Sequence, residues 1–157
     1  MAINLNHRWL KRIVIVAVIL LLLGFGFLEA LRWFAQRQGV SEVDLPAGSE
    51  IEKLAVAADY VDAYKVAVET EAIPESLMVA SFGKARQVAK TGREVVTEGS
   101  APGLRFLVSY HSHLGSPPQV TFSTAVFYES IVGRVYFFFV RPVHRRIVPF
   151  MVCQTIK

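Results

Sequence analysis

The feature that most constrains this chain is an uninterrupted apolar run at residues 13–28, which reads IVIVAVILLLLGFGFL. Thirteen of these sixteen residues are Ile, Val, Leu or Phe. At roughly −0.3 to −0.6 kcal/mol each, they favour insertion into a bilayer by about 4–8 kcal/mol. A small domain has little volume in which to enclose such a run. We therefore expect a transmembrane helix over residues 13–31, preceded by a basic flank at residues 1–12.

The flanks of the run support this interpretation. Trp9 and Trp33 lie about 36 Å apart at helical rise, which suits the two aromatic belts of a membrane. Basic side chains before the run outnumber those after it, three to two. They are Arg8, Lys11 and Arg12, against Arg32 and Arg37. The bias predicts a single-pass protein of the cell membrane, with the N-terminus inside and the domain outside.

A cleaved signal peptide is the rival interpretation of this N-terminus. The basic residues before the run fit it, but Leu28-Glu29-Ala30 is a poor match to a small-x-small cleavage site. The sequence therefore favours an uncleaved anchor.

The rest of the chain predicts a polar linker at residues 32–49 and one α+β domain at residues 50–157. We expect helices at residues 50–58, 74–82 and 85–90. Strands are expected at residues 62–69, 104–110 and 120–128, the last two forming an antiparallel hairpin. An edge strand is expected at residues 93–98. A long helix at residues 132–154 should cover the sheet and kink at Pro142.

Three segments in the second half of the chain resemble one known family. They are Thr124-Ala125-Val126-Phe127-Tyr128, Val132-Gly133-Arg134-Val135-Tyr136-Phe137 and Val140-Arg141-Pro142-Val143-His144-Arg145-Arg146-Ile147-Val148. Together they resemble the signature of the family called domain of unknown function 2867, and residues 59–66 are similar to its opening strand. Val143 stands where that family usually has Phe. Residues 94–104 are shorter than expected and lack a strand pattern.

The resemblance covers roughly residues 45–152 and implies a helix-grip fold of the START-like and polyketide-cyclase-like superfamily. Such domains bind hydrophobic small molecules between the sheet and the long helix. On this basis a lipid or another apolar ligand is expected to contact aromatic side chains of the domain. The candidates are Tyr64, Phe106, Tyr110, Phe122, Tyr128, Tyr136 and Phe139.

Basic residues dominate the end of the chain, where no acid follows Glu129. Arg134, Arg141 and Arg145 recur at intervals of seven and four, so they share one face of the predicted helix. This face could contact anionic headgroups of the membrane, or it could simply be solvated. Nucleic-acid binding is not expected, because no exposed aromatics accompany these bases.

The remaining chemistry-bearing residues are few. His144 is a weak catalytic candidate; the alternative is a histidine that binds backbone carbonyls freed at Pro142. His111 and His113 share a strand face but lack further metal ligands, so we expect them to face water and predict no metal site. Cys153 is expected to be a small buried apolar group. Cofactor and nucleotide motifs are absent, so no cofactor is expected.

Three functions follow, in order of preference. The first is a membrane-anchored domain that binds a hydrophobic small molecule without catalysing a reaction. The second is a structural or partner-binding membrane protein, pairing through the edge strand at residues 93–98. The third is a cyclase-like or hydrolase-like enzyme that uses His144 with a tyrosine.

Overall fold

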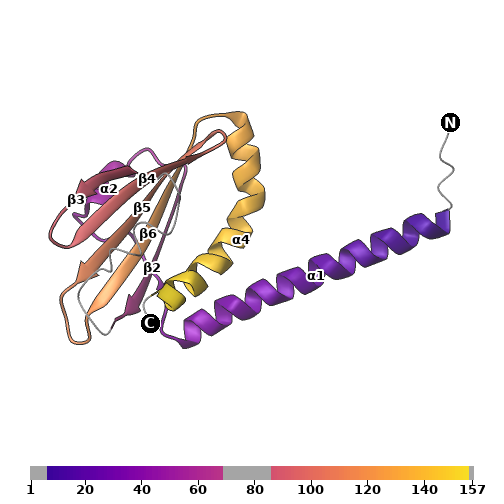
Figure 1. Ribbon diagram of the computed structural model, residues 1–157, viewed down its shortest axis with the longest axis horizontal. Helices are drawn as coiled ribbons and strands as arrows, with labels where there is room; N and C mark the ends of the chain where they lie inside the picture. The colour runs from indigo at the N-terminus through magenta and orange to yellow at the C-terminus, as the bar shows by residue number, and fades with distance from the viewer. Residues whose placement is uncertain (1–6, 69–85, 156–157) are drawn as a thin grey trace.

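The computed structural model describes residues 7–68 and 86–155, which form an α+β fold with a long apolar helix at its N-terminal end (Figure 1). The element order is α1 (His7–Arg37), β1 (Ser41–Glu42), α2 (Glu50–Leu54), β2 (Tyr60–Ala67), β3 (Arg86–Lys90), β4 (Glu94–Ala101), β5 (Leu104–His113), β6 (Gln119–Tyr128) and α4 (Ile131–Thr155). The strands form one antiparallel sheet in the order β1-β2-β6-β5-β4-β3.

Alternation along the strands divides the core between the two faces of the sheet. Val108 and Tyr110 pack with Val148 and Val152 of α4. Leu107, which points the other way, packs with residues of α2. A strand exposes successive side chains to opposite faces, so both faces of β5 are covered. The sheet therefore lies between α2 and the long C-terminal helix, as Figure 1 shows.

Several sequence predictions are confirmed. The expected hairpin is present as β5 and β6, and the strand expected at residues 62–69 is β2. Ser49 caps α2 by accepting a hydrogen bond from the Glu52 amide at 3.2 Å. The C-terminal helix is α4, which curves along its length (Figure 1) and contains Pro142 and Pro149.

Other predictions are wrong. Residues 85–90 were expected to be helical, but residues 86–90 form strand β3, which pairs with β4. The strand expected at the edge, at residues 93–98, lies inside the sheet as β4, between β3 and β5. Residues 94–104 therefore do contain a strand. The helix expected at residues 74–82 lies outside the described residues.

Part of the expected linker is also structured. Helix α1 continues to Arg37, and β1 pairs with β2 at Lys65 and Tyr64. Ala35 and Val40 are buried in the cluster that also holds Val148 and Val152. The end of α1 is thus packed onto the domain, where the rings of Phe34 and Phe150 lie 6.1 Å apart.

The start of α4 is fixed by a close backbone approach. Ser130 accepts a hydrogen bond from the Gly133 amide at 3.2 Å, which caps the helix. Gly133 also lies against Gly103, in the turn between β4 and β5, and a Cβ at position 133 would overlap the Gly103 carbonyl. Gly103 itself has φ +74°, a conformation that favours glycine. Both positions therefore need glycine for α4 to dock on this turn.

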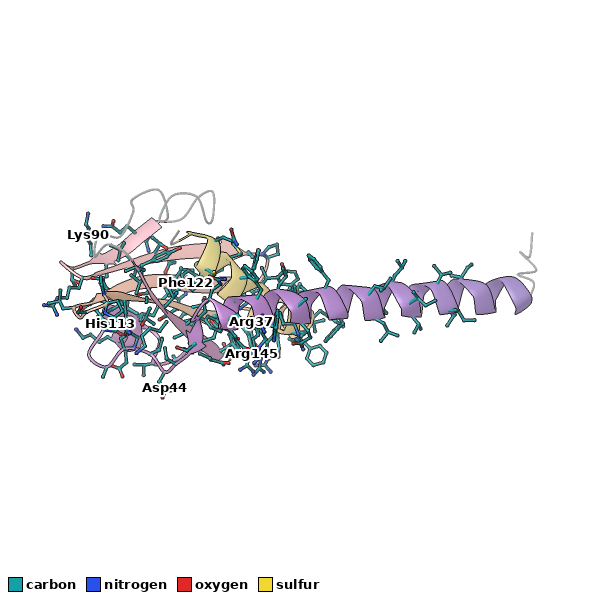
Figure 2. The ribbon with its side chains drawn as sticks, turned by 90° about the horizontal axis from the view of Figure 1, so that it is seen from below. Arg37, Asp44, Lys90, His113, Phe122 and Arg145 are labelled. Atoms are coloured by element: carbon teal, nitrogen blue, oxygen red, sulfur yellow. The ribbon has the colours of Figure 1, made fainter. Side chains whose placement is uncertain are left out.

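Helix α1 differs from the rest of the molecule. Its large apolar side chains between Ile13 and Phe27 are exposed, and they project from the helix beyond the domain (Figure 2). Within the described residues, the stretch Ile13–Arg37 is the one helix long and apolar enough to cross a membrane.

Candidate functional site

A buried carboxylate, Asp62, lies in the middle of β2 on the face covered by α4. Its side chain is 1% exposed. Strand alternation places Tyr60 and Tyr64 on the same face, on either side of it. An ionised carboxylate is expensive to bury unless donors or positive charges surround it. The neighbours of Asp62 therefore decide what this part of the molecule can do.

Donors converge on one oxygen of this carboxylate, Oδ2. The Tyr60 hydroxyl donates to it at 2.8 Å, and the Tyr64 hydroxyl donates at 3.4 Å. The ring nitrogen Nδ1 of His144 lies 3.2 Å from it, at ion-pair distance but without hydrogen-bond geometry. Tyr60, Asp62, Tyr64 and His144 are referred to below as the Asp62 cluster.

The second oxygen of the carboxylate, Oδ1, is different. It is buried and accepts no hydrogen bond from any residue that the structure describes. The Thr124 hydroxyl, on the strand residue paired with Asp62, is buried and unpartnered in the same sense. Buried polar atoms in folded proteins nearly always have partners. Two such atoms thus lie on neighbouring strands beside His144.

The electrostatics of the cluster keep both phenols protonated. Burial raises the pKa of Tyr60 well above its usual value, and the negative charge of Asp62 raises it further. The pKa of Tyr64 is raised by the same two causes in the same order. Protonated phenols can donate hydrogen bonds to Asp62 throughout the neutral range.

Raised phenol pKa values predict a specific loss of stability in alkali. Above about pH 10 the unfolded chain releases protons that Tyr60 and Tyr64 retain in the fold. The unfolded state then binds fewer protons, so the free energy of unfolding falls by up to about 1.4 kcal/mol per pH unit for each phenol. Urea unfolding in detergent between pH 9 and 11 measures this slope. We expect the free energy of unfolding of the double variant Y60F/Y64F to depend less on pH. Equal slopes for the variant and wild type would contradict this prediction.

Helix α4 places His144 in the Asp62 cluster and Arg145 beside it. His144 points inward, towards Asp62, and does not bind the carbonyl of Pro142. The carbonyl of Pro142 accepts a hydrogen bond from Arg146 at 2.6 Å. Arg145, one residue further along, donates to Glu42 of β1 at 2.5 Å. The pair Arg145–Glu42 lies beside the tyrosines and links α4 to the edge of the sheet.

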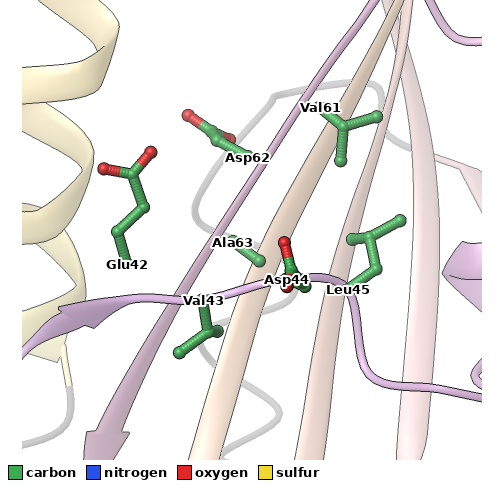
Figure 3. A pocket seen from close by; sticks show the side chains of 7 residues that line it. All are labelled: Glu42, Val43, Asp44, Leu45, Val61, Asp62 and Ala63. Atoms are coloured by element: carbon green, nitrogen blue, oxygen red, sulfur yellow. The ribbon is translucent and has the colours of Figure 1, made fainter.

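An open pocket of about 520 Å³ adjoins the cluster at this edge. Asp62 and Glu42 direct their carboxylates to the α4 side of β2, whereas Val61 and Leu45 lie towards the opposite side (Figure 3). The pocket is lined by Glu42, Val43, Asp44, Leu45, Val61, Asp62 and Ala63. It thus combines apolar side chains with carboxylates, and one of those carboxylates is the buried Asp62.

The seven aromatic candidates do not all lie together. Tyr64, Tyr110 and Phe122 are buried in one cluster, and Phe106 packs against it. Tyr128 packs beside Phe137, with ring centroids 5.9 Å apart. Tyr136 and Phe139, however, are 50% and 69% exposed on the outer side of α4. The last two cannot line a space between sheet and helix, because the helix turns them away from it.

The three arginines predicted on one helix face do lie on one side of α4, next to the sheet. Arg134 stacks over Tyr128 and Arg141 over Tyr60, with guanidinium carbons 5.7 and 5.0 Å from the ring centroids. Arg145 is paired with Glu42. All three residues are exposed, but each already has an aromatic or acidic neighbour within the domain.

His111 and His113 lie on the α2 face, where they are only partly exposed. The expectation that they simply face water is therefore wrong. His113 contacts the Thr121 hydroxyl at 2.8 Å, and His111 lies 3.6 Å from buried Glu94. Burial and the nearby His111 lower the pKa of His113. No group of three His, Cys, Asp or Glu able to hold a metal occurs among residues 7–68 and 86–155.

Glu94 has a structural role that the sequence did not suggest. It accepts hydrogen bonds from the Glu50 and Ile51 amides, at 2.5 and 3.1 Å, and from the Ser109 hydroxyl at 2.6 Å. These contacts fasten the start of α2 to the sheet. Because these hydrogen bonds come from backbone amides and a serine, Glu94 serves to hold α2 on this face of the sheet. The candidate functional site is therefore the Asp62 cluster on the other face.

Comparison with protein families supports, over part of the chain, the resemblance noted in the sequence. Residues 88–151 match DUF2867, a family of proteins of unknown function. The match runs from β3 through most of α4, so it includes His144 and the three arginines. Asp62, in β2, lies outside the matched residues. No curated protein and no solved structure matches the chain.

Proposed function

We propose that this protein is a single-pass membrane protein whose domain binds a hydrophobic small molecule beside Asp62. The anchor is supported by the exposure of α1. The apolar side chains of residues 13–27 would be strongly unfavourable in water, and the domain does not cover them (Figure 2). A bilayer removes this surface from water, and α1 is long enough to cross its hydrocarbon core.

Charge insertion into α1 tests the anchor. Each arginine at the centre of a span costs about 2.5–3.5 kcal/mol, so the double variant L20R/L21R should lose stable insertion. Membranes carrying the full chain are washed with alkaline carbonate, and the pellet is assayed. Wild type and L20A/L21A should stay in the pellet, whereas L20R/L21R should not. An intact mass that lacks the N-terminal residues would contradict the anchor and indicate a cleaved signal peptide.

The binding proposal rests on Asp62, a pocket-lining residue whose Oδ1 is buried and has no hydrogen-bond partner among the described residues. A volume of about 520 Å³ lies within the usual range for small-molecule sites, about 300–1,000 Å³. Val43, Leu45 and Val61 suit an apolar body. The free carboxylate oxygen suits a hydroxyl or amine on that body. The ligand class is therefore a largely apolar molecule that carries a hydrogen-bond donor.

The resemblance to helix-grip proteins supports the same proposal, since those domains hold hydrophobic ligands between sheet and helix. In this chain the aromatic side chains at that interface pack against each other in the described core. The pocket instead opens at the β2 edge, where β1 is only two residues long. The proposed ligand would therefore enter from this edge.

Native mass spectrometry of the full chain in detergent tests ligand binding. Val61→Trp should fill the pocket from a position that is 39% exposed, and thereby remove a ligand that co-purifies with wild type. Val56→Trp is the matched control, because Val56 is exposed outside the pocket. A wild-type protein free of ligand after incubation with lipid extract would contradict binding. It would favour the structural or partner-binding role.

A second candidate function is acid–base catalysis on the bound molecule, which the inward position of His144 favours. His144 does not line the pocket itself but lies 3.2 Å from Asp62, which does. In this function Asp62 takes a proton from the ligand and returns it to the product, and His144 positions the carboxylate. In that case His144→Gln would stop conversion of the bound molecule but leave the molecule bound. A ligand recovered unchanged from wild type would exclude this function.

A further inference from the structure

The outer face of α4 is apolar along its first half. Phe138 and Phe139 are 72% and 69% exposed, and the other members of this face are also exposed. They are Ile131, Val132, Val135, Tyr136 and Val143. At 3.6 residues per turn these positions form a continuous surface opposite the buried Gly133 and Phe137, which face the sheet. We call this surface the outer stripe of α4.

A water-exposed helix normally has the reverse pattern, with polar residues outside. A contiguous apolar patch of this kind marks an interaction surface. The position of the outer stripe indicates that its partner is the membrane. α4 crosses α1 near the end of the apolar run, where Arg146 donates to Glu29 at 2.6 Å and stacks over Phe25 at 4.6 Å. The second half of α4 therefore lies at the level where the proposed membrane span meets the domain.

From that crossing, α4 runs on along the side of the sheet from which α1 projects (Figure 1). The outer stripe thus lies on the α1 side of the domain. Arg134 and Arg141 border the stripe on its sheet side. Arginines beside an apolar face are the arrangement of a helix that lies in a membrane interface, with its bases at the headgroups.

We propose that the outer stripe of α4 inserts into the bilayer surface, so that the domain lies against the membrane at two places. This inference rests on the proposed membrane anchor. It would fix the orientation of the domain and hold the β2-edge pocket at a set distance from the lipid.

Depth-dependent quenching tests the proposal on the full chain in phosphatidylcholine–phosphatidylglycerol vesicles. Single cysteines carrying an environment-sensitive fluorophore are placed at Phe139, at Leu21 in α1, and at Lys90, an exposed residue of β3, in a Cys153→Ala background. Lipids with nitroxide groups quench a fluorophore that lies among them. We expect strong quenching at position 21, clear quenching at position 139 and none at position 90.

The outcomes separate this inference from the proposed function. Quenching at position 21 but not at 139 would overturn the insertion of α4 and leave the anchor intact. Absence of quenching at 21 would instead overturn the anchor. If the labelled position 139 is unquenched and the same cysteine, left unlabelled and then oxidised, forms disulfide cross-links between chains, the stripe is covered by a second copy, and the membrane proposal is wrong. Quenching at 139 that disappears when Val135 and Phe138 are both replaced by Ser would support it.

Discussion

Replacing Asp62 by alanine is expected to lower the free energy of unfolding by about 3–5 kcal/mol. The substitution leaves the hydroxyls of Tyr60 and Tyr64 without the acceptor they now share at 2.8 and 3.4 Å. Each buried donor left unsatisfied costs about 1–3 kcal/mol. The loss is measured by urea unfolding of the full chain in detergent, followed by near-ultraviolet circular dichroism.

Two variants sharpen this prediction. Asp62→Asn keeps one acceptor oxygen but loses the charge, so we expect a smaller loss of about 1–2 kcal/mol. Asp44→Ala removes an exposed carboxylate from the same pocket and should change stability by less than about 0.5 kcal/mol. If Asp62→Ala unfolds within about 1 kcal/mol of wild type, the tyrosines do not depend on this carboxylate, and the cluster is not the tightly coupled group described above.

Strand patterns explain why the sheet could be predicted from the sequence. Apolar residues recur at every second position from Leu104 to Tyr110 in β5 and, apart from Thr124, from Val120 to Tyr128 in β6. The loop between the two strands holds Gly115, Pro117 and Pro118. Such a pattern has few alternative structures. In contrast, residues 86–90 read RQVAK, which has no alternation and contains good helix formers. Pairing with β4 overrides this weak local preference, which is why a helix was expected there.

The Asp62 cluster was only partly visible in the sequence. Tyr64 and His144 were candidates, but Asp62 and Tyr60 were not. A signal existed: the alternation that places Tyr64 and Val66 on the buried face also places Asp62 there. A carboxylate at a core position is rarely neutral for stability and often serves function. Its partners could not be found, because His144 lies 82 positions away and meets Asp62 only through the packing of α4.

The outer stripe of α4 shows a different limit. Its residues are apolar, so the sequence suggested that Tyr136 and Phe139 face the sheet. A helix that is apolar on most sides offers no periodicity from which to choose the buried side. The choice is made by Gly133, the small residue that allows α4 to approach the β4–β5 turn. Once Gly133 faces inward, helical geometry places Phe139 outside.

Gly133 should therefore be one of the least replaceable residues of the domain. A valine at this position would drive its Cβ into the carbonyl of Gly103, and a backbone atom cannot move aside as a flexible side chain can. We expect Gly133→Val to lower the free energy of unfolding by about 3 kcal/mol, the upper part of the range for overpacking. Gly133→Ala should cost about 1–2 kcal/mol, since alanine also favours the helix by about 1 kcal/mol.

The control for this prediction is Gly92→Ala, in the turn between β3 and β4, where a Cβ would meet open space. It should leave stability within about 0.5 kcal/mol of wild type. Gly103→Ala disturbs the same Gly103–Gly133 contact from the turn, and it adds backbone strain of about 1–2 kcal/mol at φ +74°. If Gly133→Val unfolds like wild type while Gly103→Ala does not, the turn is strained but α4 is not docked on it. The orientation of α4, and with it the proposed insertion of its outer stripe into the membrane, would then be wrong.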